Sequence, residues 1–514
     1  MRKLVISSKM KLSLDDIERV SKHTFVVSLS EETRDNICHS RDILEKKLKK
    51  SKVYGVNTGV GDLCDCIISE SDMCTYQKKI LMSHAVGVGK NFEDEVVRII
   101  LLLTIKDLAS GYLGGRICLA ELLVDMLNKD VLPIIPQKGS LGASGDLVPL
   151  SHMALVLIGE GKAKYNGIIY QGSEALKKAG LHPICLQAKE ALSLINGTRV
   201  MTAIAALTVI EASKTLFVAN AISAISFEAL GGIVTCLDER IHLLRHQKGQ
   251  ICCSQHMRKL LEDSEFVSVG EHGRIQDAYS LRCISQVHGA SLDAILYIED
   301  IVLRELHAIT DNPIILWKDD KIISGGNFHG QPIALSMDFL CIALAELANI
   351  SERRMERLLN SNFSGLSPFL AANSGVDTGL MIVQYCAAAL VSENKILTHP
   401  ASVDSIPTSA GQEDHVSMGT ISSRKARNIL GNVQRVLASE LLCACQAIDL
   451  RPLLKQGKGT QKVFRYVREL IPKIEGDRFY GEDIDICEKL IMNEQFLREI
   501  GVVDLRRQAS KKKF

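Results

Sequence analysis

Apolar side chains recur at helical spacing over several long stretches of the chain. Val433 and Val436 follow Ile429 at intervals of three to four residues, which places them on one face of a helix. The same spacing predicts helices over roughly 93–112, 200–230, 286–308, 332–360 and 376–397. Because strands are only weakly indicated, the pattern favours a mainly α-helical fold, a bundle of long helices.

Local signals mark where shorter helices begin. Ser13, followed by Asp16, is a variant of the capping box. Asp146 precedes an apolar run that has Pro149 in its first turn, which predicts a helix with Asp146 as its N-cap. Glycine-rich breaks separate the helices at 54–62, 83–90, 138–146 and 324–332. Polar residues gather around these breaks, so we expect functional side chains to converge there.

The chain of 514 residues is too long for one small core. We expect an N-terminal domain over 1–200, followed over 201–514 by the long-helix bundle and a C-terminal helical region. The most apolar segment, 201–225, contains Glu211 and Lys214 and is predicted to be a buried helix instead of a membrane span.

Composition narrows the classes of partner and compartment. With 61 Lys and Arg against 60 Asp and Glu, the net charge is +1, so neither a nucleic acid nor a membrane surface is predicted as a partner. The 15 cysteines are irregularly spaced, which is typical of reduced thiols. The N-terminus has no long apolar segment of the kind found in signal peptides, and we expect a cytoplasmic protein.

One segment raises the possibility of a metal site. It contains His242, His246, Cys252, Cys253 and His256. This spacing matches no standard zinc pattern, so no metal is predicted.

The tripeptide Ala143-Ser144-Gly145 can carry chemistry of its own. In a tight bend, the Gly145 amide nitrogen can attack the Ala143 carbonyl carbon, and loss of water closes a five-membered ring. Elimination of the Ser144 hydroxyl then leaves an exocyclic methylene, giving an electrophilic 4-methylidene-imidazol-5-one without an external cofactor. Gly145 has no Cβ, so its nitrogen can approach closely. An isolated tripeptide of this kind is more often a plain turn, and the surroundings must decide.

The tripeptide lies within an ordered set of longer segments. They are "YGVNTGVG", "SHAVGVG", "GSLGASGDLVPLSHM", "ALSLINGTRV", "QDAYSLRC", "TDNP", "SGGNFHGQP" and "SENKILTHPASVDSIPTSAGQEDHVSMG". Through them the chain resembles the aromatic amino acid ammonia-lyases from about residue 10 to about residue 460. The resemblance implies a helical fold of the fumarase/aspartase-like type, and a homotetramer whose active sites are shared between chains. It also implies a methylidene-imidazolone formed from residues 143–145.

The resemblance assigns roles to further residues. Tyr54 and Tyr279 match tyrosines that assist proton transfer, and Asn196 matches an asparagine beside the ring and the substrate carboxylate. Phe328 matches an aromatic residue that shields the electrophile from water. On the bare sequence, Asn196 would be read as part of an Asn-Gly turn.

Gln276 and Arg282 match substrate-binding positions of the same family. A guanidinium can bind an α-carboxylate through two parallel hydrogen bonds, which lysine cannot do. Without the resemblance, Arg282 would be read as one surface charge among many.

Two residues bear on the substrate. His84 lies where members acting on histidine carry histidine, although members acting on tyrosine also keep it. Glu413 is more selective, because members acting on phenylalanine or tyrosine commonly have an amide there. A carboxylate can bind an imidazole N–H and transfer a proton, but it is a poor neighbour for a phenyl ring.

The implied activity is conversion of L-histidine to trans-urocanate and ammonia, with Glu413 or Tyr279 taking the β-proton. A tyrosine or phenylalanine ammonia-lyase or aminomutase on the same scaffold is the alternative. A catalytically inactive helical assembly protein is disfavoured because Ser144, Tyr54 and the two proton-transfer candidates are all present.

Overall fold

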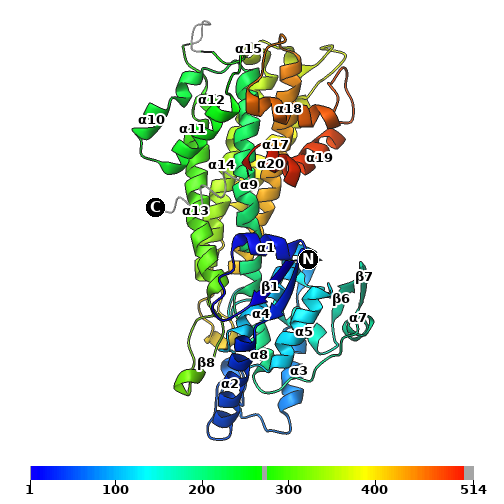
Figure 1. The fold of residues 1–514 in the computed structure, drawn as a ribbon, viewed down its shortest axis with the longest axis vertical. Coiled ribbons are helices and arrows are strands. Elements are labelled where there is room, and N and C mark those ends of the chain that lie inside the picture. The colour runs from blue at the N-terminus through cyan, green and yellow to red at the C-terminus, as the bar shows by residue number, and fades with distance from the viewer. Residues whose placement is uncertain (1, 269–274, 503–514) are drawn as a thin grey trace. The chain divides into compact units, whose positions relative to one another are not determined.

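The computed structural model describes residues 2–268 and 275–502, and it confirms the mainly α-helical fold (Figure 1). The long helices predicted from apolar spacing are present, with ends shifted by a few residues. They are α4 (Asp94–Ala109), α9 (Arg199–Ala229), α13 (Ile284–His307), α14 (Gln331–Leu359), α16 (Met381–Leu397) and α17 (Gly419–Asp449). α16 begins later than predicted because Gly375 and Gly379 adopt positive φ angles, which are incompatible with a helix.

The chain forms two compact units. Unit 1 comprises residues 1–207, 300–338 and 400–424, and unit 2 comprises 208–299, 339–399 and 425–514. This division differs from a single cut near residue 200, because two later segments return to unit 1.

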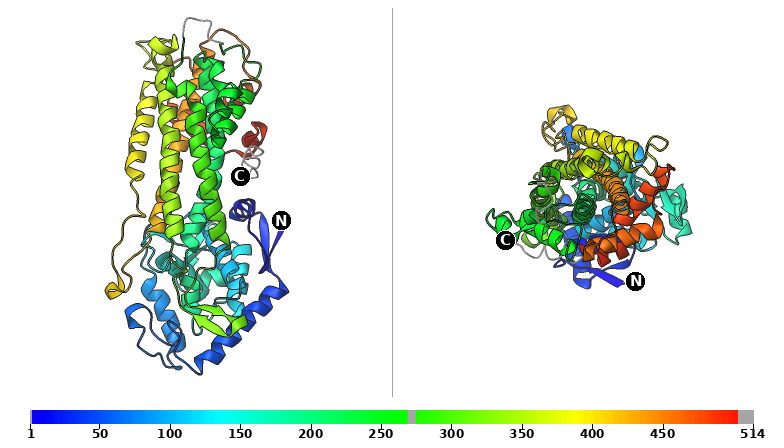
Figure 2. Two further views of the ribbon diagram at one scale, coloured as in Figure 1. Left: turned by 90° about the vertical axis from the view of Figure 1, so that its left-hand side faces the viewer. Right: turned by 90° about the horizontal axis from the view of Figure 1, so that it is seen from above.

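Unit 2 contains the greater part of the long helices, which lie side by side (Figures 1 and 2). Its core includes a buried polar cluster on α9, α14 and α17. Glu440 accepts hydrogen bonds from Arg354 at 2.6 and 2.8 Å, and from the hydroxyls of Ser226 and Ser351. Because these four hydrogen bonds converge on one carboxylate, and two of them come from a guanidinium, the buried charges of Glu440 and Arg354 compensate each other.

Shorter helices complete unit 2. They are α10 (Glu239–Leu243), α11 (Lys248–Leu260), α12 (Tyr279–Arg282), α15 (Ser361–Ser364), α18 (Lys458–Leu470), α19 (Tyr480–Ile491) and α20 (Glu494–Glu499), with the 3₁₀ helices η2 (Val234–Leu237) and η4 (Pro368–Leu370). The segment considered for a metal lies on α10 and α11. His242 contacts the Cys236 carbonyl and Gln250, and burial lowers the pKa of His256 to about 3. Within residues 2–268 and 275–502, no three His, Cys, Asp or Glu side chains are grouped to hold a metal.

Unit 1 combines helices with four small sheets. β1 (Arg2–Ile6) pairs in parallel with β2 (Phe25–Leu29), and β3 (Val88–Asn91) pairs with β5 (Pro136–Lys138). β6 (Lys162–Tyr165) lies between β4 (Leu132–Pro133) and β7 (Ile168–Gln171), and β8 (Ile314–Leu316) pairs with β9 (Lys321–Ile323). The remaining helices are α1 (Leu14–Ser21), α2 (Glu31–Leu48), α3 (Met73–His84), α5 (Ile117–Asn128), α6 (Leu147–Leu157), α7 (Gly172–Lys178) and α8 (Glu190–Ile195), with η1 (Gly61–Leu63), η3 (Trp317–Asp319) and η5 (Ser409–Gly411). The predicted capping box of Ser13 and Asp16 is confirmed at the start of α1.

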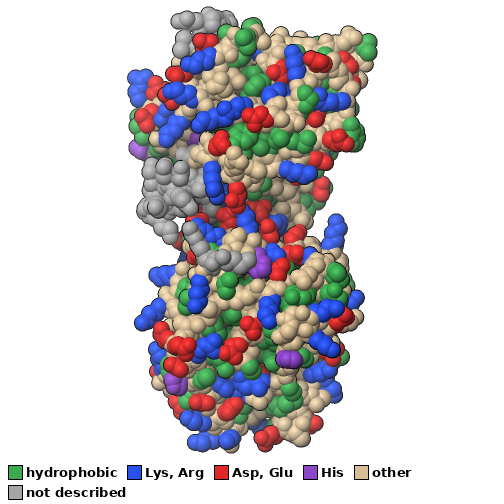
Figure 3. Space-filling model, turned by 45° about the vertical axis from the view of Figure 1, so that its right-hand side comes forward, with side chains coloured by type: hydrophobic (Ala, Val, Ile, Leu, Met, Phe, Trp, Pro, Cys, Tyr) green, Lys and Arg blue, Asp and Glu red, His purple; other side chains and the backbone are tan. Residues whose placement is uncertain are grey.

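In the part of the chain that the structure describes, two helices, α9 and α14, are long and apolar enough to cross a membrane by length and composition. In α9, 94% of the most apolar window is buried inside the protein, as expected for a core helix. On the face drawn in Figure 3, Lys and Arg side chains are interspersed with Asp and Glu side chains.

Candidate active site

A cavity of about 700 Å³ in unit 1 brings together residues from loops far apart in the sequence. Among the residues predicted for the site, it is lined by Tyr54, Ala143, Ser144, Asn196, Phe328 and Glu413. The other lining residues are Leu192, Asn312, Ser324, Gly325, Gly326, His329, Gln412, Asp414 and His415. Three of the four glycine-rich breaks, at 54–62, 138–146 and 324–332, therefore converge as predicted, whereas the break at 83–90 contributes no lining residue.

The predicted reactive tripeptide lies in a tight turn between Gly142 and Gly145, which pair as an isolated β-bridge. Gly145 has a φ of +74°, and a Cβ added there would lie 2.1 Å from the Gly197 carbonyl oxygen. The Gly197 N–H donates to the Ser144 carbonyl at 3.1 Å, and the Asp146 N–H donates to the Gly197 carbonyl at 2.8 Å. Only glycine fits at position 145, and these residues fit the requirements of ring closure between Ala143 and Gly145.

Asp146 occupies the N-cap position of α6, but its carboxylate does not cap that helix. It accepts hydrogen bonds at 2.9 Å from the N–H groups of Val200 and Met201 in the first turn of α9. The hydroxyls of Ser140 and Thr420 also donate to it. Burial raises the pKa of this carboxyl, and the four donors oppose that shift. The predicted cap is thus corrected: Asp146 joins the tripeptide loop to the starts of α9 and α17.

Asn196 follows the last residue of α8, and two hydrogen bonds fix its side chain. The Nδ2 group donates to Asp311 Oδ1 at 3.2 Å and to the Asn312 carbonyl at 3.1 Å. Its backbone carbonyl accepts a hydrogen bond of 2.6 Å from the buried guanidinium of Arg199, which also binds the Ser193 and Leu194 carbonyls. These contacts satisfy carbonyl groups at the end of α8 and fix the chain beside Ser144.

Tyr54 and Glu413 lie on two loops that contact each other. The Tyr54 hydroxyl accepts a hydrogen bond of 3.0 Å from the Gly61 N–H, and the neighbouring Asp62 N–H donates to the Ser409 hydroxyl. Glu413 pairs with Thr408 through the backbone, and the Thr408 hydroxyl donates to Glu413 Oε2 at 2.8 Å. The phenol and the carboxylate are therefore both positioned at the cavity wall.

Two histidines of the cavity wall were missed by the sequence analysis. His329 and His415 stack with ring centroids 5.8 Å apart and planes at 9°. Each lies within two residues of a predicted site residue, Phe328 or Glu413, and that proximity was the available signal. The stack therefore contributes two imidazole rings to the cavity wall.

Besides Gly145, which lies in the turn described above, four predicted site residues do not line the cavity. His84 is the last residue of α3, and its Nδ1 contacts the Ile80 carbonyl at 2.8 Å. Gln276, Tyr279 and Arg282 belong to unit 2. The Tyr279 side chain is 71% exposed, and the Arg282 guanidinium lies 4.5 Å from the centre of its ring. Their predicted roles in the site stay predictions.

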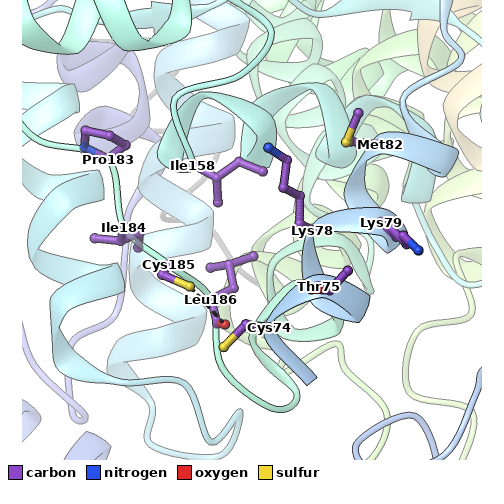
Figure 4. A pocket seen from close by; sticks show the side chains of 10 residues that line it. All are labelled: Cys74, Thr75, Lys78, Lys79, Met82, Ile158, Pro183, Ile184, Cys185 and Leu186. Atoms are coloured by element: carbon purple, nitrogen blue, oxygen red, sulfur yellow. Dashed lines mark hydrogen bonds between the residues drawn. The ribbon is translucent and has the colours of Figure 1, made fainter. Parts of the chain in front are cut away.

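A second cavity, of about 580 Å³, contains none of the predicted residues (Figure 4). Its wall is largely aliphatic, with the thiols of Cys74 and Cys185 and the amines of Lys78 and Lys79. Lys78 forms an ion pair of 2.7 Å with Glu160. The first cavity, where several polar side chains converge, is therefore the candidate active site.

Comparisons with known proteins agree with this assignment. A family model described as "Aromatic amino acid lyase" matches residues 12–469. A protein named histidine ammonia-lyase from Caldanaerobacter subterraneus subsp. tengcongensis is 50% identical over 507 residues, covering 98% of this chain and 100% of that protein. The crystal structure of histidine ammonia-lyase from Trypanosoma cruzi matches with a TM-score of 0.89 and 38% identity, covering 100% of this chain and 96% of that one. Tyrosine aminomutase from Streptomyces globisporus matches with a TM-score of 0.91 and 34% identity, covering 97% and 98%.

The close packing at Gly145 predicts a strong and local effect of substitution. Gly145→Ala should destabilise the protein more than Gly167→Ala, a control with a φ of +79° and no atom within 4 Å of an added Cβ. Both variants carry the backbone strain of a left-handed alanine, about 1 kcal/mol, but only the first forces atoms apart, at a further cost of about 1–3 kcal/mol. Thermal unfolding measures both. Equal losses in the two variants would show that residues 145 and 197 are not in contact.

Proposed function

The chain belongs to the aromatic amino acid lyase family, and we propose that it converts L-histidine to trans-urocanate and ammonia. The observation that carries the proposal is the presence of Ser144, Tyr54 and Glu413 in one cavity. Relatives named histidine ammonia-lyase, 50% and 49% identical over nearly the whole chain, support histidine as the substrate.

We further propose that residues 143–145 form a 4-methylidene-imidazol-5-one, with no external cofactor. When formed, this group supplies an electrophilic carbon for the substrate's amino group. The turn at Gly145, where an added Cβ would meet Gly197, supports the proposal, because ring closure needs a residue without Cβ there. Asp146 and the Gly197 backbone hold the loop in place.

Glu413 is the proposed base for the β-proton of histidine, with Tyr279 as the other candidate. The Thr408 hydroxyl binds one oxygen of Glu413 and holds the carboxylate at the cavity wall. A carboxylate in this place can also accept a hydrogen bond from the imidazole N–H, which a phenyl ring lacks. Phe328 and the imidazoles beside it limit access of water to Ser144.

Arg282 and Gln276 are the proposed partners of the substrate carboxylate, and His84 is a further proposed contact of the imidazole. We propose that a homotetramer completes each site from several chains. Exposed apolar side chains on α13, α14 and α16 support an interface between copies of the chain. Those in unit 2 are Tyr297, Phe339, Ile342, Ile382, Tyr385 and Ile396.

The second candidate is a tyrosine or phenylalanine ammonia-lyase or aminomutase. The structural match to tyrosine aminomutase supports this second candidate, because the two proteins share a scaffold and 34% of their sequence. We propose a cytoplasmic location, which the 15 free cysteines support.

Ser144→Ala tests the proposed electrophile. The variant cannot form the exocyclic methylene, so turnover of L-histidine should fall almost to zero, and the near-ultraviolet absorbance beyond that of aromatic residues should disappear. Ser151→Ala on α6 is the matched control and should keep both signals. Circular dichroism checks that the helices persist. Near-normal turnover by Ser144→Ala would refute the proposal.

Glu413→Gln tests the assignment of the substrate and the base. Glutamine is nearly isosteric but cannot take a proton, so kcat for histidine should fall about 100-fold or more. His84→Phe should lower the use of histidine relative to phenylalanine. The measurement is kcat/KM for histidine, tyrosine and phenylalanine on each variant. If kcat/KM of the wild type is no higher for histidine than for tyrosine, histidine is not the preferred substrate. That result would not contradict the lyase chemistry.

Mixed tetramers test whether chains share sites. Tyr54→Phe and Tyr279→Phe should each be nearly inactive, and subunit exchange between them should restore part of the turnover. Recovery requires that the two tyrosines of one site come from different chains. A label on one of the two variants allows the extent of subunit exchange to be measured. Exchange without recovery of turnover would contradict sharing between these residues.

A further inference from the structure

The amide of Asn196 is fixed in one orientation. Its Nδ2 group faces two acceptors, Asp311 Oδ1 at 3.2 Å and the Asn312 carbonyl oxygen at 3.1 Å. Turning the amide over would place its own oxygen against these two oxygens, so the hydrogen bonds decide the assignment. The Asn196 side chain consequently presents its Oδ1 atom on the other side.

That oxygen is a buried acceptor without a donor. Asn196 is only 2% exposed and lines the candidate active site. Among the residues that the structure describes, no group donates to its Oδ1. Because buried polar atoms nearly always find a partner, an acceptor left unpaired in a residue that lines the cavity points to a donor supplied by a ligand.

Asp311 determines the orientation of the Asn196 amide because its two carboxylate oxygens bind different partners. Oδ1 accepts hydrogen bonds from the Asn312 N–H at 2.8 Å and from Asn196, whereas Oδ2 accepts from Lys189 Nζ at 2.6 Å. Both ionisable side chains are fully buried, and burial lowers the pKa of Lys189 and raises that of Asp311. Whichever of the two holds the proton, Oδ1 remains an acceptor for Asn196.

Both the backbone conformation and the buried position of Lys189 are energetically unfavourable. It has a φ of +71°, in the left-handed region that residues other than glycine rarely adopt, and its ammonium is removed from water. Ser193 is its only further hydrogen-bond partner among the described residues. Strain and a buried charge at one residue beside a cavity indicate a function beyond stability.

The group that meets Asn196 Oδ1 must donate a hydrogen bond. Under the proposed function, on which this inference rests, the amino group of histidine reacts beside Ser144. The N–H of Gly197 binds the Ser144 carbonyl, so Asn196 and Ser144 are anchored side by side. We propose that Asp311, neutralised by Lys189, is a positioning residue that holds Asn196 so that its Oδ1 accepts a hydrogen bond from the substrate's amino group.

This role differs from the one that the family resemblance implies for Asn196. An ionised carboxylate has no proton to donate, so it cannot pair with an amide oxygen. The carboxylate therefore depends on other donors, and Asn196 distinguishes amino-bearing ligands from analogues without a donor at that carbon.

Two non-reacting probes test the proposal by calorimetry. 3-(Imidazol-4-yl)-L-lactate carries a donating hydroxyl where histidine has its amino group, and 3-(imidazol-4-yl)propionate carries only hydrogens. The wild type should bind the lactate about fivefold more tightly, as expected for one added hydrogen bond of about 1 kcal/mol. A ratio near one overturns the inference, and this measurement needs no substitution.

Two double variants then isolate the acceptor at position 311. Lys189→Met with Asp311→Asn removes both charges but keeps an oxygen, which the Asn312 N–H orients, so the fivefold ratio should persist. Lys189→Met with Asp311→Leu removes the oxygen, so Asn196 can turn over, and the ratio should fall to about one while propionate binds as before. Equal ratios in the two variants, or a loss of affinity for both probes alike, would contradict the positioning role.

The same experiment separates this inference from the proposed function. If neither probe binds and L-histidine is not consumed, the proposed function fails. If histidine is consumed but the wild type does not discriminate between the probes, only the positioning role fails.

Discussion

The site depends on three backbone segments that lie closer together than side chains would permit. A Cβ on Gly145 would lie 2.1 Å from the Gly197 carbonyl oxygen, and a Cβ on Gly197 would lie 2.1 Å from the Thr310 carbonyl oxygen. Two glycines thus stack the segment of Ser144 on that of Asn196, and the latter on that of Asp311. Because the contact is between backbones, packing of the main chain fixes where these three side chains begin, whatever rotamers they adopt.

Buried charges hold the stack in place, and each of them is compensated. The carboxylate of Asp146 is surrounded by hydroxyl and amide donors, Lys189 pairs with Asp311, and the Arg199 guanidinium lies 3.4 Å from Asp107. Removing one member of such a pair leaves an uncompensated charge, at a cost of about 3–5 kcal/mol. The arrangement therefore tolerates little local movement, and a preorganised site of this kind loses little free energy to reorganisation when a ligand binds.

The sequence was sufficient for the long helices, because the apolar spacing that predicts α9 or α17 is the same spacing that buries those helices. Through the family resemblance of its motifs it also predicted Ser144, Asn196 and Glu413 as site residues, and the loops that carry them do meet. Lys189 could not be found in this way. It precedes Glu190, and a Lys-Glu pair is typical of a solvent-exposed position, whereas its burial depends on Asp311, 122 residues away. Asp146 was placed correctly as the residue before α6, but its partners on α9 come from a distant segment.

The helices around the tripeptide explain why a mainly helical protein suits this site. α6, α9 and α17 begin at Leu147, Arg199 and Gly419, and the Asp146 side chain touches the starts of the last two. Each helix N-terminus carries a partial charge of about +0.5, so three of them exceed the single negative charge of Asp146 even when that carboxyl is ionised. Burial raises the pKa of Asp146, and protonation would increase the excess. These helix N-termini therefore offset the negative charge of Asp146 beside residues 143–145.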